Sequence, residues 1–233
     1  MKILCLYNND VAIELFDWLK ESNHETVLCS ERIDDTWCGE QSFDLTVSYT
    51  YRYVLTKEVI NALKNNVVNI HNSFLPWNRG ADPNIWSILD NTPRGVTLHY
   101  VDEKLDHGDI IAQVLLPANH KDGSTIEDNA ESLLSTYKEL DKAAKDLFKA
   151  AFSYYPFWNS MRKTSSQLGS YHKSSEMAEF KNRIRSFEIK IDEAKEIYHS
   201  LTAPKPRGGV FRRINVSQAC YARSQDLFEE CVA

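Results

Sequence analysis

The stretch that most constrains the fold is a short apolar, β-branched run that turns polar at its end, Val67-Val68-Asn69-Ile70-His71. Such a run is typical of a strand buried in a parallel sheet. Side chains alternate along a strand, so Asn69 and His71 should leave it on the same side. In open parallel sheets, ligands bind beyond the carboxyl ends of the strands. The stretch therefore predicts a parallel sheet and a binding site at its edge.

The residues before this stretch predict the beginning of the same sheet. Apolar runs at 2–7, 25–29 and 45–49 are typical of strands, and residues 11–20 have the apolar periodicity of a helix. A strand–helix–strand order favours a parallel, Rossmann-like sheet. The G-x-G-x-x-G phosphate fingerprint is absent from the first turn, so a nicotinamide dinucleotide is not the expected ligand.

Local signals predict further elements around the central strand. Thr56 is placed to cap a short helix, and Asp82-Pro83 is expected to begin another, since proline is tolerated in a first turn. Residues 95–101 and 110–116 predict two more strands. A capping-box pattern at 124–127 then precedes the apolar stripe of a long amphipathic helix that ends near Phe152.

The character of the chain changes near residue 155. Residues 159–175 are polar and predict a loop-rich connection, after which short helices are expected near 175–185 and 192–201. A turn after residue 203 should feed a final strand. We therefore predict an α/β fold with a Rossmann-like, mostly parallel sheet and a small C-terminal α+β extension. The expected domains are 1–155 and 156–233.

Composition narrows the class of protein. The 233 residues carry a formal net charge of -6, which argues against a nucleic-acid backbone as the main partner. The five cysteines form no Cys-x-x-Cys pair, which favours reduced thiols and a cytoplasmic location. No apolar run approaches the length of a membrane span, and the apolar run formed by the first residues is too short for a signal peptide. A soluble protein is expected.

Four motifs surround the central strand: Asn-x-His at 69–71, Ser-x-Leu-Pro at 73–76, Arg-Gly at 79–80 and Leu-Asp-x-Gly-Asp-Ile at 105–110. In this order they resemble the folate-dependent formyltransferases. That family includes glycinamide ribonucleotide transformylase, methionyl-tRNA formyltransferase and the sugar N-formyltransferases. The resemblance implies the formyltransferase fold, with the larger domain carrying the catalytic residues.

The resemblance also implies which residues act. The family's catalytic Asn, His and Asp are matched here by Asn69, His71 and Asp106. Its co-substrate is N10-formyltetrahydrofolate, and no metal is expected. Two segments would hold the pterin, largely through backbone groups. The matching positions are Tyr53, Val54, Leu55, Asp102, Glu103, Lys104, Leu105 and Asp106.

These side chains suit the chemistry of formyl transfer. Attack of an amine on the formyl carbon produces a tetrahedral intermediate, whose negative oxygen needs hydrogen-bond donors. The amide of Asn69 and an imidazole N–H of His71 are suitable donors. The incoming ammonium must also lose a proton, and histidine is the side chain that titrates near physiological pH. Asp106 would orient His71 or accept the proton through a water, and the sequence leaves that choice open.

Two other classes of function compete with this interpretation. Carboxylates near 102–109, together with His71, His99 and His107, are residue types that bind divalent metals, as in a metal hydrolase. Their spacing matches no metal motif such as H-E-x-x-H. A non-catalytic folate- or nucleotide-binding module is the second alternative, which the intact Asn-His-Asp set disfavours.

The resemblance also bears on the amine acceptor. Methionyl-tRNA enzymes carry a larger C-terminal nucleic-acid-binding domain, and glycinamide ribonucleotide enzymes have Pro-Gly where this chain has Arg-Gly at 79–80. The sugar enzymes resemble this chain better at 74–84 and at 169–172. A nucleotide-linked dideoxy amino sugar is therefore the expected acceptor, with dTDP-4-amino-4,6-dideoxyglucose the first guess and O-antigen biosynthesis the setting.

The loop after the catalytic strand would line the sugar pocket. Its candidates are Arg79, Asp82, Asn84 and Trp86, although turn, cap and core roles would explain the last three equally well. The related sugar enzymes are often dimers joined through C-terminal elements. The extension 156–233 is therefore expected to contribute substrate and homodimer contacts.

Overall fold

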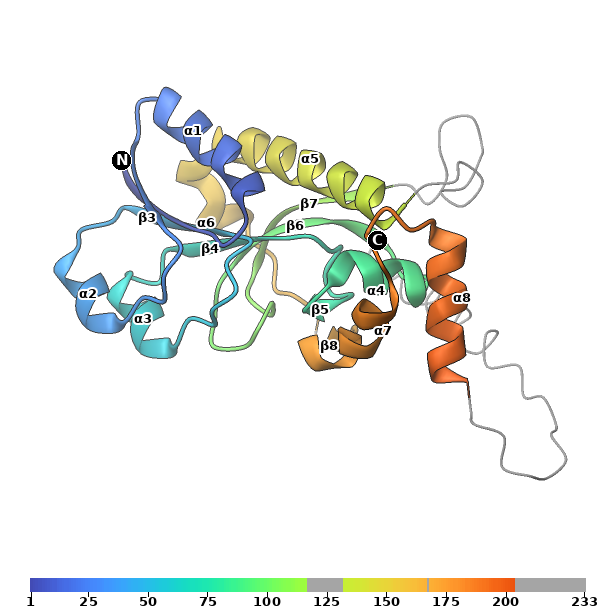
Figure 1. Cartoon of the computed structure of the whole chain (residues 1–233). Coiled ribbons are helices and arrows are strands. Elements are labelled where there is room, and N and C mark those ends of the chain that lie inside the picture. The colour runs from blue at the N-terminus through green and yellow to red at the C-terminus, as the bar shows by residue number, and fades with distance from the viewer. Residues whose placement is uncertain (117–131, 167, 204–233) are drawn as a thin grey trace, which may run out of the picture.

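A computed structural model describes residues 1–116, 132–166 and 168–203 of the chain. At its centre is a six-stranded sheet in the order β2-β1-β3-β4-β6-β7 (Figure 1). Parallel pairings join β1 to β2, β1 to β3 and β3 to β4, whereas β6 runs antiparallel to both β4 and β7. The predicted Rossmann-like, mostly parallel sheet is confirmed. Its strands are β1 (Lys2–Leu6), β2 (Glu25–Cys29), β3 (Leu45–Tyr49), β4 (Val67–His71), β6 (Arg94–Tyr100) and β7 (Ile110–Leu116).

Helices cover both faces of the sheet (Figure 1). On one face, Ile3 and Cys5 of β1 pack into a core with the first and the longest helix, while on the other Leu4 and Leu6 pack against two short helices. This alternation is the period of two that a strand buried on both faces requires. The first face is covered by α1 (Ile13–Glu21), α5 (Leu133–Phe152) and α6 (Trp158–Met161), the second by α2 (Asp35–Glu40) and α3 (Lys57–Ala62).

The caps explain several of these boundaries. Thr56 accepts a hydrogen bond from Val59 N at the start of α3, as predicted. No helix was expected at α2, which Asp34 caps by accepting from Trp37 N. The capping box predicted at 124–127 lies outside the described residues. A reciprocal pair of hydrogen bonds between Ser132 and Ser135 caps α5 instead.

The remaining elements gather beyond the carboxyl ends of the parallel strands (Figure 1). The two short helical regions predicted after residue 175 are confirmed, and their apolar faces pack on α4 through Trp86, Met177 and Phe180. The expected loop at 159–175 contains a strand, β8, that pairs in parallel with β5. The final strand expected after residue 203 lies outside the described residues. These elements are β5 (Arg79–Gly80), α4 (Pro83–Leu89), β8 (Tyr171–His172), α7 (Ala178–Arg183) and α8 (Ile191–Thr202), with a 3-10 turn at Ser174–Met177. Two other 3-10 turns, Asp10–Ala12 and Tyr155–Phe157, directly precede α1 and α6.

Helix length and hydropathy bear on the expectation that no segment spans a membrane. Within the three described ranges, no helix combines the length and apolar character needed to cross a membrane.

Candidate functional site

The site begins at the carboxyl end of β4. Val68 and Ile70 point into the core beneath α1 and α5, so the alternation of the strand turns Asn69 and His71 to its other side. Both polar side chains line the same cavities, and His71 is 8% exposed. The predicted placement of these two residues together is confirmed.

Asp106 joins them from the loop between β6 and β7. Its carboxylate Oδ2 lies 3.7 Å from His71 Nε2 and accepts from Gly80 N at 2.9 Å, while Oδ1 lies 3.6 Å from His99 Nε2 and 3.5 Å from Asn69 Nδ2. Burial alone would raise the pKa of this carboxyl. The imidazoles of His71 and His99 in their protonated forms, together with the Gly80 N–H, outweigh that effect and hold the pKa of Asp106 well below its usual range. The group is therefore a carboxylate at neutral pH.

The hydrogen bonding of His71 identifies the protonated nitrogen of the neutral ring. Its Nε2 lies 3.0 Å from the backbone carbonyl of Asn78. A carbonyl only accepts hydrogen bonds, so Nε2 carries the hydrogen and Nδ1 holds the lone pair. We expected an imidazole N–H of His71 to face the reacting oxygen. In the neutral ring the one N–H is already engaged with Asn78, so the geometry equips His71 to accept a proton instead.

His99 is a member of the cluster that the sequence offered only as a metal-ligand candidate. It is 1% exposed, and its Nδ1 donates to the carbonyl of Tyr100 at 2.7 Å. Its Nε2 is then free to accept from Asn69 Nδ2, 3.3 Å away. His99 is also the partner of Asn69 in the β4–β6 register. The feature that identifies His99 is the pairing of β6 with β4, because it brings this histidine beside Asn69.

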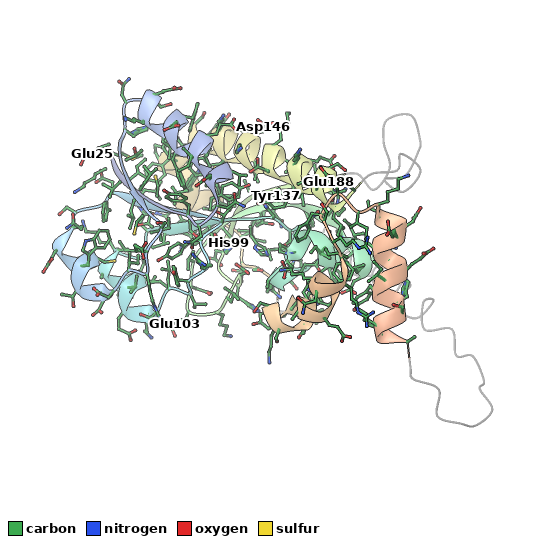
Figure 2. The ribbon with its side chains drawn as sticks, in the orientation of Figure 1. Glu25, His99, Glu103, Tyr137, Asp146 and Glu188 are labelled. Carbon is green, nitrogen blue, oxygen red and sulfur yellow. The ribbon has the colours of Figure 1, made fainter. Side chains whose placement is uncertain are left out.

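Two cavities meet at this cluster, and both are lined by Asn69, His71 and Gly80. One, the loop-side cavity, encloses about 750 Å³ between the loops after β3 and β6. Figure 2 shows His99 near the centre of the molecule, with Glu103 of this cavity below it in the view. Every position predicted to bind the cofactor lines the loop-side cavity. These are Tyr53, Val54, Leu55, Asp102, Glu103, Lys104, Leu105 and Asp106.

The second, the helix-side cavity, encloses about 620 Å³ against α4 and α5. Tyr137, above His99 in Figure 2, lies on its wall. Two of the predicted substrate residues line it. Asp82 also pairs with Lys181 at 2.5 Å, and the Asn84 amide donates to the α5 residue Thr136 at 3.1 Å.

The other two predicted substrate residues are placed differently, because neither is among the residues that line the two cavities. Arg79 is 2% exposed, and its guanidinium donates to the carbonyl of Asp106 at 3.0 Å and to Ser165 Oγ at 3.1 Å. Trp86 is buried in the α4 core, where its ring stacks on His172 at 3.9 Å. The packing gives both side chains other partners, and their sugar contact stays a prediction.

The metal alternative is addressed by the arrangement of potential ligands. Across the described part of the chain, no group of three or more His, Cys, Asp or Glu side chains is arranged to hold a metal ion. His107, one of the candidates, has an Nδ1 that is buried without a hydrogen-bond partner. Burial is the main cause that lowers the pKa of this imidazole.

The chain is similar to a protein family, to a solved structure and to curated relatives. The family model for formyl transferases matches residues 20–139. A crystal structure of the formyltransferase PseJ from Anoxybacillus kamchatkensis, in complex with UDP-4,6-dideoxy-4-formamido-L-AltNAc and tetrahydrofolate, is similar with a TM-score of 0.69 at 29% identity. The similarity covers 83% of this chain and 97% of that one.

Two curated relatives match parts of the chain. A methionyl-tRNA formyltransferase from Fusobacterium nucleatum is 30% identical over 176 residues, which are 74% of this chain and 51% of that protein. A dTDP-4-amino-4,6-dideoxyglucose formyltransferase from Mycobacterium tuberculosis is 40% identical over 73 residues, 31% of this chain and 30% of that one. The chain thus spans about half the length of the first relative and less of the second.

Proposed function

Because this chain belongs to the formyl transferase family, we propose that it transfers a formyl group from N10-formyltetrahydrofolate to the amino group of a nucleotide-linked amino sugar. The single observation that carries this proposal is the meeting of two cavities at Asn69 and His71. A group transfer needs two substrates held with their reacting atoms in contact. Two cavities that share one polar centre provide that arrangement.

The folate is assigned to the loop-side cavity. Residues 53–55 and 102–106, matched to the pterin-binding segments of the family, lie together on its wall although they are about fifty positions apart. The bound tetrahydrofolate of PseJ supports this choice of co-substrate. The cavity volume falls within the roughly 300–1,000 Å³ that small-molecule sites occupy.

The nucleotide sugar is assigned to the helix-side cavity, where its amine would face His71. Asp82 and Asn84 lie on the wall of this cavity, together with the aromatic side chains of Tyr137 and Phe187. Polar groups among aromatic ones suit a ligand that combines a base, a sugar ring and hydroxyls. The bound UDP-linked 4-formamido sugar of PseJ supports an acceptor of this class.

The proposed reaction uses His71, Asn69 and Asp106, while His99 holds the amide of Asn69. The amine nitrogen forms a bond to the formyl carbon and yields its proton to His71 Nδ1. Asn69 Nδ2, held only by long contacts to His99 and Asp106, donates to the negative oxygen of the intermediate. The carbon–N10 bond then breaks as N10 takes up the proton from the His71 imidazolium, and the Asp106 carboxylate balances the charge on that imidazolium in the meantime.

The narrower assignments also start from the membership of this chain in the formyl transferase family. We propose dTDP-4-amino-4,6-dideoxyglucose as the first acceptor to test, supported by the relative that is 40% identical over 73 residues. We also propose a cytoplasmic homodimer that serves O-antigen biosynthesis. Residues 1–155 would form its catalytic domain and 156–233 the extension for substrate and dimer contacts.

A second acceptor is favoured by one observation. A methionyl-tRNA formyltransferase matches 176 residues of this chain, against 73 for the dTDP-sugar relative. Transfer to methionyl-tRNA is therefore the competing proposal, and the net charge of -6 weighs against it.

A competition assay tests these proposals. The full chain is incubated with N10-formyltetrahydrofolate and equal concentrations of dTDP- and UDP-linked amino sugars, methionyl-tRNA and glycinamide ribonucleotide. We expect formylated nucleotide sugar as the main product, with mild salt dependence because a nucleotide sugar offers few phosphate charges. Preferred formylation of tRNA or glycinamide ribonucleotide would overturn the acceptor. Turnover of no acceptor would overturn the function.

A further inference from the structure

The loop at 78–80 contacts two ionisable members of the catalytic cluster, His71 and Asp106. The carbonyl of Asn78 accepts from His71 Nε2 at 3.0 Å, and Gly80 N donates to Asp106 Oδ2 at 2.9 Å. The first contact decides which nitrogen of the neutral His71 ring holds the lone pair. The position of this loop therefore determines whether His71 can take a proton from an amine through Nδ1.

This loop is held from outside by a segment of the C-terminal extension, residues 165–166 and 168–172, called here the strap. Asn78 N donates to Ser170 Oγ at 2.7 Å, and that hydroxyl donates to Asn78 Oδ1 at 3.1 Å. The backbone joins in, because Arg79 N donates to the carbonyl of Ser170 and Ala81 N to that of His172. One hydroxyl thus fixes both the peptide and the side chain of Asn78, 92 residues away in the sequence.

Two glycines allow the strap and the loop to approach so closely. Gly169 has φ +141°, and a Cβ there would lie 2.1 Å from the carbonyl oxygen of Pro76. Gly80 has φ +90°, and its Cβ would lie 2.3 Å from the carbonyl oxygen of His172. No other residue type fits either place without moving the backbone. The close contact between the strap and the loop therefore depends on glycine at these two positions.

Asn78 needs such support because its backbone is in the left-handed region, with φ +55°. Its side chain is fully buried, and its Nδ2 donates to Thr92 Oγ1 at 2.7 Å. Without the Ser170 hydroxyl, the buried N–H and Oδ1 of Asn78 would each lose a partner, which disfavours the present geometry. The loop would relax, and its carbonyl would no longer face His71.

We propose that Ser170 is a positioning residue for the transfer reaction, acting through the carbonyl of Asn78 to keep the hydrogen of His71 on Nε2. This inference rests on the proposed function only in assuming that His71 Nδ1 receives the proton of the amine. The C-terminal extension, through the strap, then completes the catalytic centre of the larger domain.

The decisive variant is Ser170→Ala. We expect kcat to fall roughly tenfold to a hundredfold, the scale of a small misplacement of a catalytic group. KM for folate and for the acceptor should stay as in the wild type, because Ser170 lines neither cavity among those described. Imidazole ¹⁵N NMR of the full chain should show His71 moving from the Nε2–H tautomer toward the Nδ1–H form.

Two further variants separate positioning from structure. Ser160→Ala is the matched control, because it removes a hydroxyl that donates to the carbonyl of Phe157 within its own turn, and kcat should not change. Ser170→Thr keeps the hydroxyl at a half-buried position and should restore both kcat and the tautomer. A Ser170→Ala enzyme with wild-type kcat and tautomer overturns the inference, as does a Thr variant that behaves like Ala.

The tautomer measurement also keeps this inference separate from the function. If the wild type formylates none of the tested acceptors, the proposed function fails, yet the ¹⁵N spectrum still reports whether Ser170 controls His71. If the wild type is active and Ser170→Ala leaves the tautomer unchanged, the function stands and the positioning role is wrong.

Discussion

The two cavities that meet at Asn69 and His71 are built in different ways. The loop-side cavity takes half of its lining residues from two continuous loops, 51–55 and 101–106, that follow strands of the sheet, and a further run from residues 171–175. The helix-side cavity draws on β3, β4, α4, α5 and Phe187. A ligand recognised by continuous loops can be shared by a whole family, whereas a wall assembled from distant segments can change with each acceptor. With folate and acceptor assigned to the two cavities as proposed, the difference implies that cofactor and acceptor specificity are encoded separately.

The largest effect is expected where the cavities meet. Asn69→Ala removes the proposed donor to the intermediate, and His71→Ala removes the proposed base. Each should lower kcat by roughly 10²–10³ while the Tm and folate affinity stay near wild type. Steady-state kinetics, thermal melting and folate titration measure the three quantities. Near-native kcat in either variant would contradict the proposal that the two cavities share a catalytic centre at Asn69 and His71.

A smaller loss of rate is expected at Asp106. Asp106→Asn keeps the shape of the side chain but removes the charge beside His71, and kcat should fall by about 10², the lower end for groups that serve proton transfer. Because His71, His99 and the Gly80 N–H lower the pKa of Asp106 in the folded state, the carboxylate favours folding above its ordinary pKa of about 4.

The lowered pKa of Asp106 determines the direction in which stability should change with pH. As the pH falls below about 4, the unfolded chain binds a proton on Asp106 before the folded chain does, so this stabilisation is progressively lost. The wild type should therefore lose stability between neutral pH and pH 3 more steeply than Asp106→Asn. Urea unfolding at several pH values measures the difference. Equal slopes would contradict the arrangement of charges around Asp106.

A matched pair of substitutions tests the separation of the cavities. Phe187 and Leu105 are similarly exposed, at 45% and 42%, and line the helix-side and the loop-side cavity respectively. Phe187→Ala should raise KM for the acceptor about tenfold and leave that for folate unchanged, and Leu105→Ala should do the reverse, since losing an apolar contact commonly costs about 1–3 kcal/mol. Both KM values rising in both variants would show that the cavities are not independent.

The smallest effect is expected at the rim of the loop-side cavity. Lys57 pairs with Glu103 at 2.6 Å, but both side chains are more than half exposed, at 60% and 61%. Exposed ion pairs contribute little, because water screens the charges and the side chains lose freedom. Lys57→Ala should leave Tm and the KM for folate unchanged. A clear rise in KM would show that charge at this rim takes part in folate binding.

Local patterns in the sequence determined most of the sheet, and the motifs indicated Asn69, His71 and Asp106 but not the place of His99 in the cluster. Alternation along one strand places Asn69 and His71 on the same side, and the motif around Asp106 supplies the carboxylate. The segments expected to hold the folate came from the resemblance to the family, because recognition through backbone groups leaves no side-chain pattern of its own. Short-range periodicity, capping and turn chemistry act over a few residues, which is why sequence alone carries them.

Only the tertiary structure decided what each polar group contacts. Arg79 could bind a phosphate or a carbonyl with equal chemistry, and packing of the strap assigned it to Asp106 and Ser165. Trp86 stacks on His172 from a different part of the chain, and Asn78 determines the tautomer of His71 because Ser170 holds it from 92 residues away. A side chain's type fixes what it can bond, whereas its partner depends on which segments the whole fold brings together.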